Sequence, residues 1–296
     1  MSSPKKILVT AATGAQGTGT VHHCLQAGHE VYALVRDTSS EKAKGLQQQG
    51  ATLIKGDLDD PESLEVAMRG MNAVFLNLPA QAGAQAAKNV ITAARASPTV
   101  SVMIASSVVR AGQHETFPRW GPEWSMYNYW LTKDDVEKYV RNAGFKYWTI
   151  VRPARFLQNF LPPNRNIYYP GFEKDSTFRV AFTPEAKIAW IDARDVGVVA
   201  AAAVSQPQKY TGRHIDLAAE SLTIQEYANK IGDFMSMTIK VHYYTDEEIA
   251  AMPSTIMADA QIWTCEVPSD DAAEASKEFN LTSVEKFLQE NENLLK

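Results

Sequence analysis

The chain has 296 residues, of which 45% are hydrophobic, so it can form one large α/β domain or a nucleotide-binding domain with a smaller lobe. Its net charge is −5, from 29 basic and 34 acidic residues without any basic run, which argues against a nucleic-acid surface or an anionic membrane surface. The two cysteines lie far apart in the sequence, which predicts a reduced protein without a disulfide, and the histidines show no metal-ligand spacing, which predicts no metal site. Because no long apolar stretch occurs, we expect no membrane span and a cytoplasmic location.

Short β-branched runs alternate with helical patterns along the first half of the chain. This alternation is typical of βαβ units, which build a parallel sheet covered by helices. The predicted strands are 6–10, 30–36, 52–55, 73–78, 100–105 and 147–151, and the predicted helices are 17–27, 40–49, 62–68, 82–96 and 123–142. The order predicts an α/β fold with a doubly wound (Rossmann) parallel sheet.

The pattern becomes irregular after Pro153, where prolines, glycines and aromatic residues follow one another closely. Mixed α/β elements are predicted further on, at 187–191, 196–204, 214–217, 223–234, 238–243 and 284–294. We therefore expect a Rossmann domain over residues 1–155 and a smaller C-terminal substrate lobe over 156–296, with segments near 186–218 returning to the Rossmann sheet. Residues 156–172 are expected to form one wall of the substrate site.

The glycine-rich run at residues 10–19 carries the strongest functional signal of the sequence. It follows an apolar strand, opens a helix and includes Thr13, Gly14, Gln16 and Gly17. Glycines let the backbone approach a dinucleotide pyrophosphate, and the free N–H groups of the helix start favour the anion. Short glycine patterns also form ordinary turns, but here the strand, the run and the helix agree. A dinucleotide site is therefore predicted.

Arg36 ends the second predicted strand, about twenty residues after the glycine run. An acidic side chain at this point binds a ribose 2′-hydroxyl, whereas an arginine accommodates a 2′-phosphate, so NADP(H) is favoured over NAD unless Arg36 is an ordinary exposed arginine. Lys42 and Lys44 would add positive charge or lie on a solvated helix face. Asp57 and Leu58 are candidate adenine contacts, or they form a turn and a helix cap before Pro61.

Tyr129 precedes Lys133 by four residues on a predicted helix, so the two side chains share a face. A nearby ammonium would lower the pKa of the tyrosine from its usual value of about 10, and Tyr129 could then protonate a carbonyl oxygen as hydride arrives. Lys133 alone is the alternative acid–base group. Ser106 and Ser107 end the fifth predicted strand, where open α/β sheets bind ligands, and Ser107 is expected to hydrogen-bond the substrate oxygen unless both serines only form a turn.

Aromatic residues gather around this predicted helix and the loop that follows the sixth strand. They are Trp120, Trp124, Trp130, Phe160, Tyr168 and Tyr169. Such a group is consistent with an apolar or aromatic substrate pocket, for which Trp120, Phe160 and Tyr168 are candidates, and equally with core packing.

Together these features resemble the short-chain dehydrogenase/reductase superfamily, and within it the atypical NmrA-like branch. The resemblance covers about 250 residues. Beyond the glycine run it includes the segments 75–77, 81–83, 136–144, 149–153 and 191–197, with Phe156 and Asn159. The resemblance implies that Gly14 and Gly17 line the pyrophosphate and that Arg36 meets the adenosine ribose. It implies that Asn77 and Gln81 lie along the cofactor. It also implies that Lys133 holds the nicotinamide ribose and that Pro153 and Phe156 flank the nicotinamide. Phe156 and Asn159 would also line the substrate pocket, and Thr13, Gln16, Asp57, Leu58 and Ser106 would complete the cofactor site.

Two positions depart from the family pattern. Ala11 replaces the first glycine, which crowds the first turn slightly. Many NmrA-like members lack the tyrosine and act as sensors or regulators, whereas Tyr129 completes a reductase pattern with Ser107 and Lys133. We therefore predict an NADP-dependent reductase that acts on a carbonyl or conjugated double bond of a small, apolar or aromatic metabolite, with homodimerisation left open. The alternative is a non-catalytic redox sensor or transcriptional co-regulator.

Overall fold

The structure is a computed structural model that describes residues 3–79, 82–269 and 271–295. The chain divides into two compact units, and each is made of separate stretches of sequence. The first unit comprises Met1–Gly112, Leu131–Pro153 and Ala193–Ile215, and the second comprises Gln113–Trp130, Ala154–Asp192 and Asp216–Lys296. The segment at 113–130 thus groups with the later part of the chain. The domain boundary expected after residue 155 stays a prediction.

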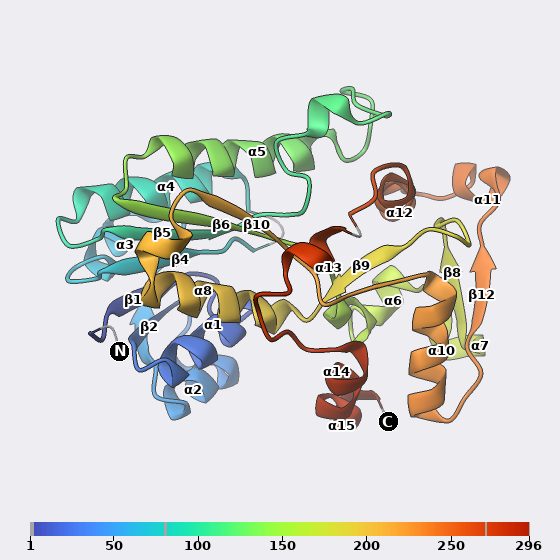
Figure 1. The fold of residues 1–296 in the computed structure, drawn as a ribbon, viewed down its shortest axis with the longest axis horizontal. Helices are drawn as coiled ribbons and strands as arrows, with labels where there is room; N and C mark the ends of the chain where they lie inside the picture. The colour runs from blue at the N-terminus through green and yellow to red at the C-terminus, as the bar shows by residue number, and fades with distance from the viewer. Residues whose placement is uncertain (1–2, 80–81, 270, 296) are drawn as a thin grey trace. The chain divides into compact units, whose positions relative to one another are not determined.

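A seven-stranded sheet forms the centre of the first unit, with the order β10-β6-β5-β4-β1-β2-β3 (Figure 1). Its strands are β1 Lys6–Val9, β2 Glu30–Val35, β3 Thr52–Lys55, β4 Ala73–Leu76, β5 Val102–Ser106, β6 Tyr147–Pro153 and β10 Arg213–Leu217. The pairs from β3 through β6 all run parallel. The chain order reverses between β1 and β4, which is the point where open parallel sheets bind their ligands. The predicted α/β fold class is therefore confirmed.

Helices cover both faces of this sheet (Figure 1). They are α1 Ala15–Gln26, α2 Glu41–Gln48, α3 Pro61–Ala67, α4 Ala84–Ala96, α5 Tyr127–Asn142, α8 Val196–Ser205 and α9 Pro207–Tyr210, and a short 3-10 turn at Ala193–Asp195 precedes α8. On one face, α3, α4 and α5 bury aliphatic side chains such as Leu64, Val90 and Val140 against Leu76 and Met103 of the sheet. Because this apolar packing surrounds the strands, their carboxyl ends are held in fixed positions.

On the other face, α1 packs against α8 through glycines. A Cβ atom on Gly19 would lie 2.2 Å from the carbonyl oxygen of Arg194, and one on Gly197 would lie 2.4 Å from the carbonyl group of Gly19. A side chain at either point would overlap backbone atoms, so only glycine allows these segments to pack this closely. This contact fixes the direction of α1, whose N-terminus follows the glycine run.

The second unit contains two small sheets, ordered β11-β9-β7 and β12-β8. The strands are β7 Arg155–Phe156, β8 Thr177–Val180, β9 Ile188–Ile191, β11 Glu220–Leu222 and β12 Lys240–Tyr243. The helices are α6 Arg165–Tyr168, α7 Phe172–Asp175, α10 Ile224–Met235, α11 Asp246–Ala250, α12 Ile256–Glu266, α13 Asp271–Ala275, α14 Val284–Glu290 and α15 Glu292–Leu295, with 3-10 turns at His114–Thr116 and Leu157–Phe160. None of the described helices is long and apolar enough to cross a membrane.

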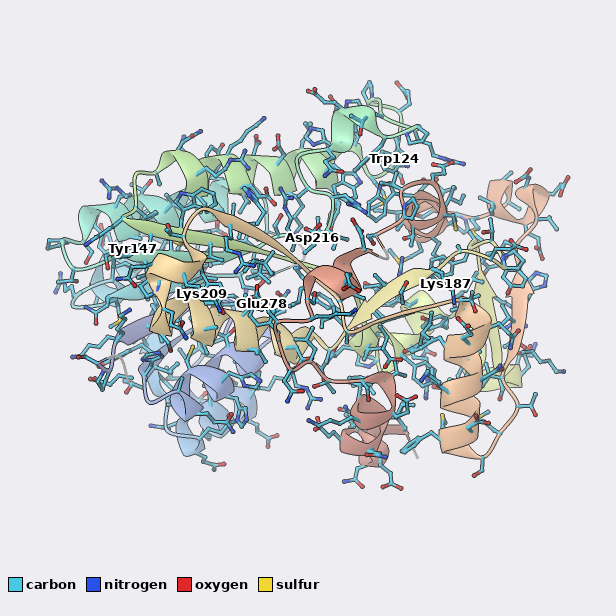
Figure 2. All side chains as sticks on the ribbon, viewed as in Figure 1. Trp124, Tyr147, Lys187, Lys209, Asp216 and Glu278 are labelled. Atoms are coloured by element: carbon cyan, nitrogen blue, oxygen red, sulfur yellow. The ribbon has the colours of Figure 1, made fainter. Side chains whose placement is uncertain are left out.

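Aromatic stacking forms the core of the second unit. Tyr227 of α10 lies parallel to Trp190 of β9, with 4.1 Å between the ring centroids, and Tyr169 stacks on Phe178 of β8 at 4.2 Å. Lys187, labelled in Figure 2, forms an ion pair of 2.9 Å with Glu226, which also caps α10. These contacts hold β9 and α10 together around the aromatic rings.

Candidate functional site

The turn between β1 and α1 leaves open space at one glycine and none at another. A Cβ atom on Gly17 would lie 2.4 Å from the carbonyl oxygen of Ala11, so the fold itself requires glycine there. A Cβ atom on Gly14 would meet only the Ala11 oxygen, at an ordinary 3.4 Å. Since the protein does not need a glycine at position 14, the space beside it is available to a ligand.

Ala11 itself has a φ of +46°, in the left-handed region. The sequence predicts slight crowding at this position, whereas in the structure the strain lies in the backbone conformation of Ala11. A left-handed conformation costs an alanine about 1–2 kcal/mol, which explains why the family pattern has glycine here.

The N-terminus of α1 has no side-chain cap. Gly14 is its N-cap residue, Thr13 lies just before it, and the first turn has no acidic residue. The free N–H groups and the positive end of the helix dipole therefore face the open side of Gly14, which favours an anion such as a phosphate group.

Side chains tie the carboxyl ends of three strands to this turn. The hydroxyl of Thr10 donates to the carbonyl oxygen of Asn77 at 2.7 Å and accepts from the Asn77 N–H at 2.9 Å, which links β1 to β4. The hydroxyl of Ser106, at the end of β5, donates to Gln16 Oε1 at 2.5 Å. The structure thus brings together Gln16, Asn77 and Ser106, whose cofactor roles stay predictions, whereas Gln81 lies outside the described residues.

Ser107 has a buried hydroxyl group without a partner. Its backbone N–H donates to the carbonyl oxygen of Val151 at 2.8 Å, and the residue is 6% exposed. Among the described residues, no group lies within hydrogen-bond distance of its Oγ atom. An unsatisfied buried hydroxyl costs about 1–3 kcal/mol, so a hydrogen-bonding ligand atom would relieve it.

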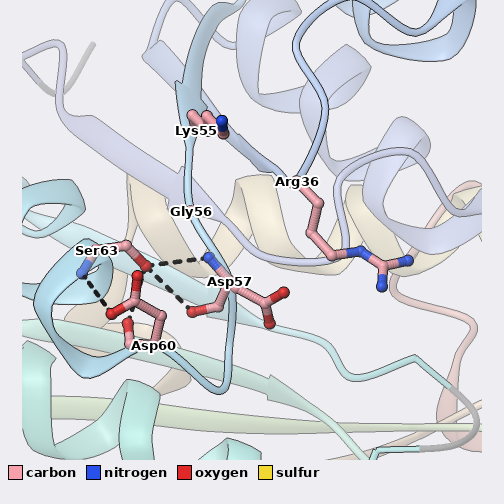
Figure 3. A pocket seen from close by; sticks show the side chains of 6 residues that line it. All are labelled: Arg36, Lys55, Gly56, Asp57, Asp60 and Ser63. Atoms are coloured by element: carbon pink, nitrogen blue, oxygen red, sulfur yellow. Dashed lines mark hydrogen bonds between the residues drawn. The ribbon is translucent and has the colours of Figure 1, made fainter.

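Arg36 lines a pocket of about 320 Å³ at the carboxyl ends of β2 and β3, together with Lys55, Gly56, Asp57, Asp60 and Ser63 (Figure 3). Lys55 pairs in register with Val35, which precedes Arg36 in sequence, so the two cations flank one edge of the sheet. Neither Lys42 nor Lys44, the cations considered from sequence, lines this pocket. Lys55 lies beside Arg36 because of the register between β2 and β3, which cannot be deduced from a sequence motif.

The loop that closes this pocket is held by its own polar groups. Ser63 Oγ accepts from the Asp57 N–H at 3.0 Å, and the Asp60 carboxylate accepts from the Ser63 N–H at 3.3 Å (Figure 3). The Asp60 carboxylate also accepts from the Glu62 N–H at 3.1 Å. Asp60, rather than Asp57, therefore caps α3. The carbonyl oxygen of Leu58 accepts from the Asn89 side chain at 2.9 Å, which fixes the backbone beside the pocket.

Lys133 lies half-buried on α5, one turn before the fully buried Glu137. Burial lowers the pKa of Lys133, and the negative charge of Glu137 opposes this shift. The Glu137 carboxylate is fixed by Arg152, which donates to it at 2.7 and 2.9 Å, and by Arg141 at 3.2 Å. An amine with a lowered pKa exchanges its proton more readily near neutral pH.

Tyr129 belongs to the second unit and is 39% exposed overall. Loss of water around its hydroxyl group raises the pKa, Tyr168 raises it further, and the positive charge of Arg155 opposes the rise. The expected lowering of the Tyr129 pKa is therefore wrong, and the cation that acts on this phenol is Arg155. The role of Tyr129 as proton donor stays a prediction.

The remaining candidates for a substrate pocket also lie in the second unit. Phe160 is fully buried against Tyr169 and Phe178, which is the core role that the sequence left open. Trp120 contacts other rings, with its centroid 4.4 Å from that of Tyr127. Phe156, Asn159 and Tyr168 are partly exposed. Pro153, a predicted cofactor contact, belongs to the first unit and is buried at the end of β6. The pocket roles of these residues stay predictions.

The parallel sheet, its switch point and the uncapped helix after a glycine turn define the class of dinucleotide-binding Rossmann proteins. Within that class, a model of the NmrA-like family matches residues 3–288. The chain belongs to the NmrA-like family, as the sequence motifs indicated.

Relatives in this family include enzymes. An NAD(P)H azoreductase from Xenophilus azovorans is 30% identical over 204 residues, which are 68% of this chain and 64% of the relative. The probable pinoresinol-lariciresinol reductase 3 of Arabidopsis thaliana is 24% identical over 205 residues, 66% of this chain and 61% of the relative. The matched region therefore spans less than two thirds of each relative.

Solved structures share the fold with this chain. NmrA, a negative transcriptional regulator solved in complex with NAD, has a TM-score of 0.77 at 23% identity and covers 97% of this chain and 95% of its own. The NADPH-dependent quinone oxidoreductase QOR2 from Escherichia coli, complexed with NADPH, has a TM-score of 0.75 at 20% identity and covers 96% and 99%. A regulator and an enzyme thus have the same architecture.

Proposed function

We propose that this protein is an NADP(H)-dependent reductase of a small, apolar or aromatic metabolite that carries a carbonyl group or a conjugated double bond. The observation that carries the proposal is the pair of cations, Arg36 and Lys55, over a pocket at the edge of the sheet that also holds the open turn at Gly14. The names of the relatives, an NAD(P)H azoreductase and an NADPH-dependent quinone oxidoreductase, agree with it.

The residues of the first unit fit this cofactor. The backbone beside Gly14 and Gly17 and the N-terminus of α1 would hold the pyrophosphate, and Arg36 and Lys55 would bind the 2′-phosphate. Gln16, Asn77 and Ser106 would line the rest of the dinucleotide. When bound, the cofactor supplies a hydride.

We infer that Ser107 and Lys133 handle the substrate oxygen. The unpaired hydroxyl of Ser107 would donate a hydrogen bond to it, and Lys133 would deliver a proton. The pKa directions support this choice of donor, because burial lowers the pKa of Lys133 but raises that of Tyr129. Tyr129 remains the competing donor, and a variant separates the two below.

Titration with NADPH and NADH tests the cofactor. Replacement of Arg36 or Lys55 by alanine should weaken NADPH binding by about ten- to a hundredfold and leave NADH binding nearly unchanged, because each variant loses one charge-assisted contact to the phosphate. Lys42→Ala is the matched control, since Lys42 does not line the pocket. Equal affinities of the wild type for both cofactors would contradict the assignment.

Turnover separates the enzyme from the regulator. NADPH oxidation would be followed with a panel of ketones, aldehydes, enones, quinones and azo compounds. Lys133→Met should lower kcat by about 10²–10⁴ if it is the proton donor, whereas Tyr129→Phe should have a small effect. If the wild type binds NADPH tightly but oxidises it with none of these compounds, the regulatory function would replace the enzymatic one.

A further inference from the structure

Arg155 is the one arginine of the second unit that has no acidic partner within the described residues. The unit contains four arginines: Arg119, Arg155, Arg165 and Arg179. The other three pair with carboxylates, namely those of Glu266, Glu173 and Asp175. In the described part of the chain, the guanidinium of Arg155 takes part in no ion pair and its Nε atom is buried without a hydrogen-bond partner.

The surroundings of Arg155 are aromatic. Its guanidinium carbon lies 5.0 Å from the centroid of the Phe182 ring, and Arg155 pairs in register with the buried Trp190. Arg155 is partly exposed, whereas its Nε atom is buried, and a ring face stabilises a cation by about 0.5–2 kcal/mol. The Nε–H donor therefore still has no acceptor among the described residues.

Three phenolic side chains of the same unit lie near Arg155. The positive charge of Arg155 opposes the rise in the pKa of three phenols, those of Tyr129, Tyr169 and Tyr227, so their hydroxyl groups lie within its field. The hydroxyl of Tyr227 is buried, and no described residue accepts or donates a hydrogen bond to it. A guanidinium and phenolic hydroxyls surrounded by aromatic rings are complementary to an anionic oxygen on a flat apolar molecule.

We propose that Arg155 anchors an anion subsite and that the ligand of the second unit is an aromatic carboxylate. The planar guanidinium matches the two oxygens of a carboxylate, and the phenolic hydroxyls can donate to the same oxygens. The aromatic walls favour an aryl acid over inorganic phosphate, which also offers anionic oxygens. The inference deepens the proposed function, on which it rests, because it assigns a charge to the otherwise apolar substrate.

Calorimetric titration of the full chain, with and without saturating NADPH, tests the subsite. Benzoate and cinnamate are the probes, and benzamide and cinnamamide are their neutral counterparts. The wild type should bind the acids at least about tenfold more tightly than the amides, the ratio expected for a charge-assisted contact. Equal binding of acid and amide, or no binding of either acid, would overturn the proposal. Inorganic phosphate that binds as tightly as benzoate would overturn the aromatic specificity.

Two variants locate the effect. Arg155→Met keeps an apolar stem over Phe182 and removes the charge, so the acids should lose at least about tenfold in affinity and the preference over the amides should vanish. Arg179→Met removes a cation that already pairs with Asp175 and should change neither value. An unchanged preference in Arg155→Met would refute the anchor. Arg155→Lys keeps the charge but not the planar fork, so it should retain part of the preference even if the methionine variant unfolds.

The readout also separates this proposal from the reductase proposal. Acid binding is measured without turnover, and NADPH titrations of the same variants report the cofactor site independently. Loss of the acid preference with NADPH binding intact would refute the subsite alone. If the wild type binds the aromatic acids but does not bind NADPH, the proposal of a reductase would be refuted and the proposal of the anion subsite would remain.

Discussion

Lys133 and Tyr129 are four residues apart on one helix, yet burial moves their pKa values in opposite directions. Burial disfavours the charged form of each side chain, so an ammonium loses its proton more easily and a phenol keeps it more firmly. Lys133 also has the fixed carboxylate of Glu137 one turn away, which limits the shift. The sequence showed the spacing but not the burial, and for this reason the expected direction for Tyr129 was wrong.

The pH dependence of turnover distinguishes the two donors. A general acid must be protonated, so kcat/KM should fall as the pH rises through the lowered pKa of Lys133, that is, below its ordinary value of 10.5. Tyr129→Phe should keep this falling limb, and Lys133→Met should remove it together with most of the activity. A limb that begins only above about pH 10 and disappears in Tyr129→Phe would assign the proton to the tyrosine instead.

Gly14 and Gly17 differ in the space that is available for a methyl group at each position. Gly17→Ala should destabilise the fold by about 3 kcal/mol or more, because the new methyl group would overlap the Ala11 backbone. Gly14→Ala should cost less than about 1 kcal/mol in stability but should weaken NADPH binding, since its methyl group would occupy the space left for phosphate. Urea unfolding and NADPH titration of both variants measure the two effects. Unchanged NADPH affinity in Gly14→Ala would argue against a pyrophosphate at this turn.

The strands and helices of the first unit were predictable because hydrophobic periodicity, and glycines near the ends of helices, are local properties of the sequence. All six predicted strands and five predicted helices of the first half occur in the structure. The helix expected from residue 123 begins at Tyr127, because Trp124 and Tyr127 donate their N–H groups to turns that start at Gly121 and Trp124. What the sequence did not reveal depends on register or burial, as for Lys55 beside Arg36 and for the unpaired Arg155.

The close contact of α1 with α8 allows us to predict how substitution of two helical glycines, Gly197 and Gly45, changes the stability of the protein. Gly197→Ala should destabilise the protein by about 2–3 kcal/mol, because its Cβ would lie 2.4 Å from the Gly19 backbone and force the helices apart. Gly45→Ala is the matched control in α2, where nothing lies within 4 Å of the new atom, and it should stabilise the protein by about 0.5–1 kcal/mol. Thermal and urea unfolding give both values. A neutral Gly197→Ala would mean that α1 and α8 can separate without cost.

Family membership and fold agree across nearly the whole chain, and this architecture occurs both in a transcriptional regulator and in an enzyme. The distinction depends on a few side chains that the fold merely positions. Among the described residues of this chain, Arg36 and Lys55 of the first unit line a pocket, and Arg155 of the second unit lies beside Phe182 without an ion pair. Binding measurements on variants of these residues therefore distinguish an enzyme from a regulator better than further comparison of folds does.

The stability of the whole protein should depend on pH through His29, which lies between β1 and α8. Its Nδ1 atom accepts from the Lys5 backbone N–H at 3.3 Å, and its Nε2 atom lies 2.9 Å from the Ser205 hydroxyl. Burial, followed by the charge of Lys5, lowers the pKa of His29 below 6.5. Below about pH 6.5 the unfolded chain takes up a proton that the folded protein resists, so the free energy of unfolding should decrease as the pH falls towards 5.

His214 adds to this loss, because burial lowers its pKa as well. Urea unfolding at pH 7.5, 6 and 5 should therefore show a decline in the wild type that is smaller in His29→Gln, which cannot take up the proton. His22→Gln is the matched control, since His22 lies on α1 in the same unit, and it should retain the full decline. An equally steep decline in His29→Gln would show that the acid sensitivity comes from other groups, with His214 the first to replace.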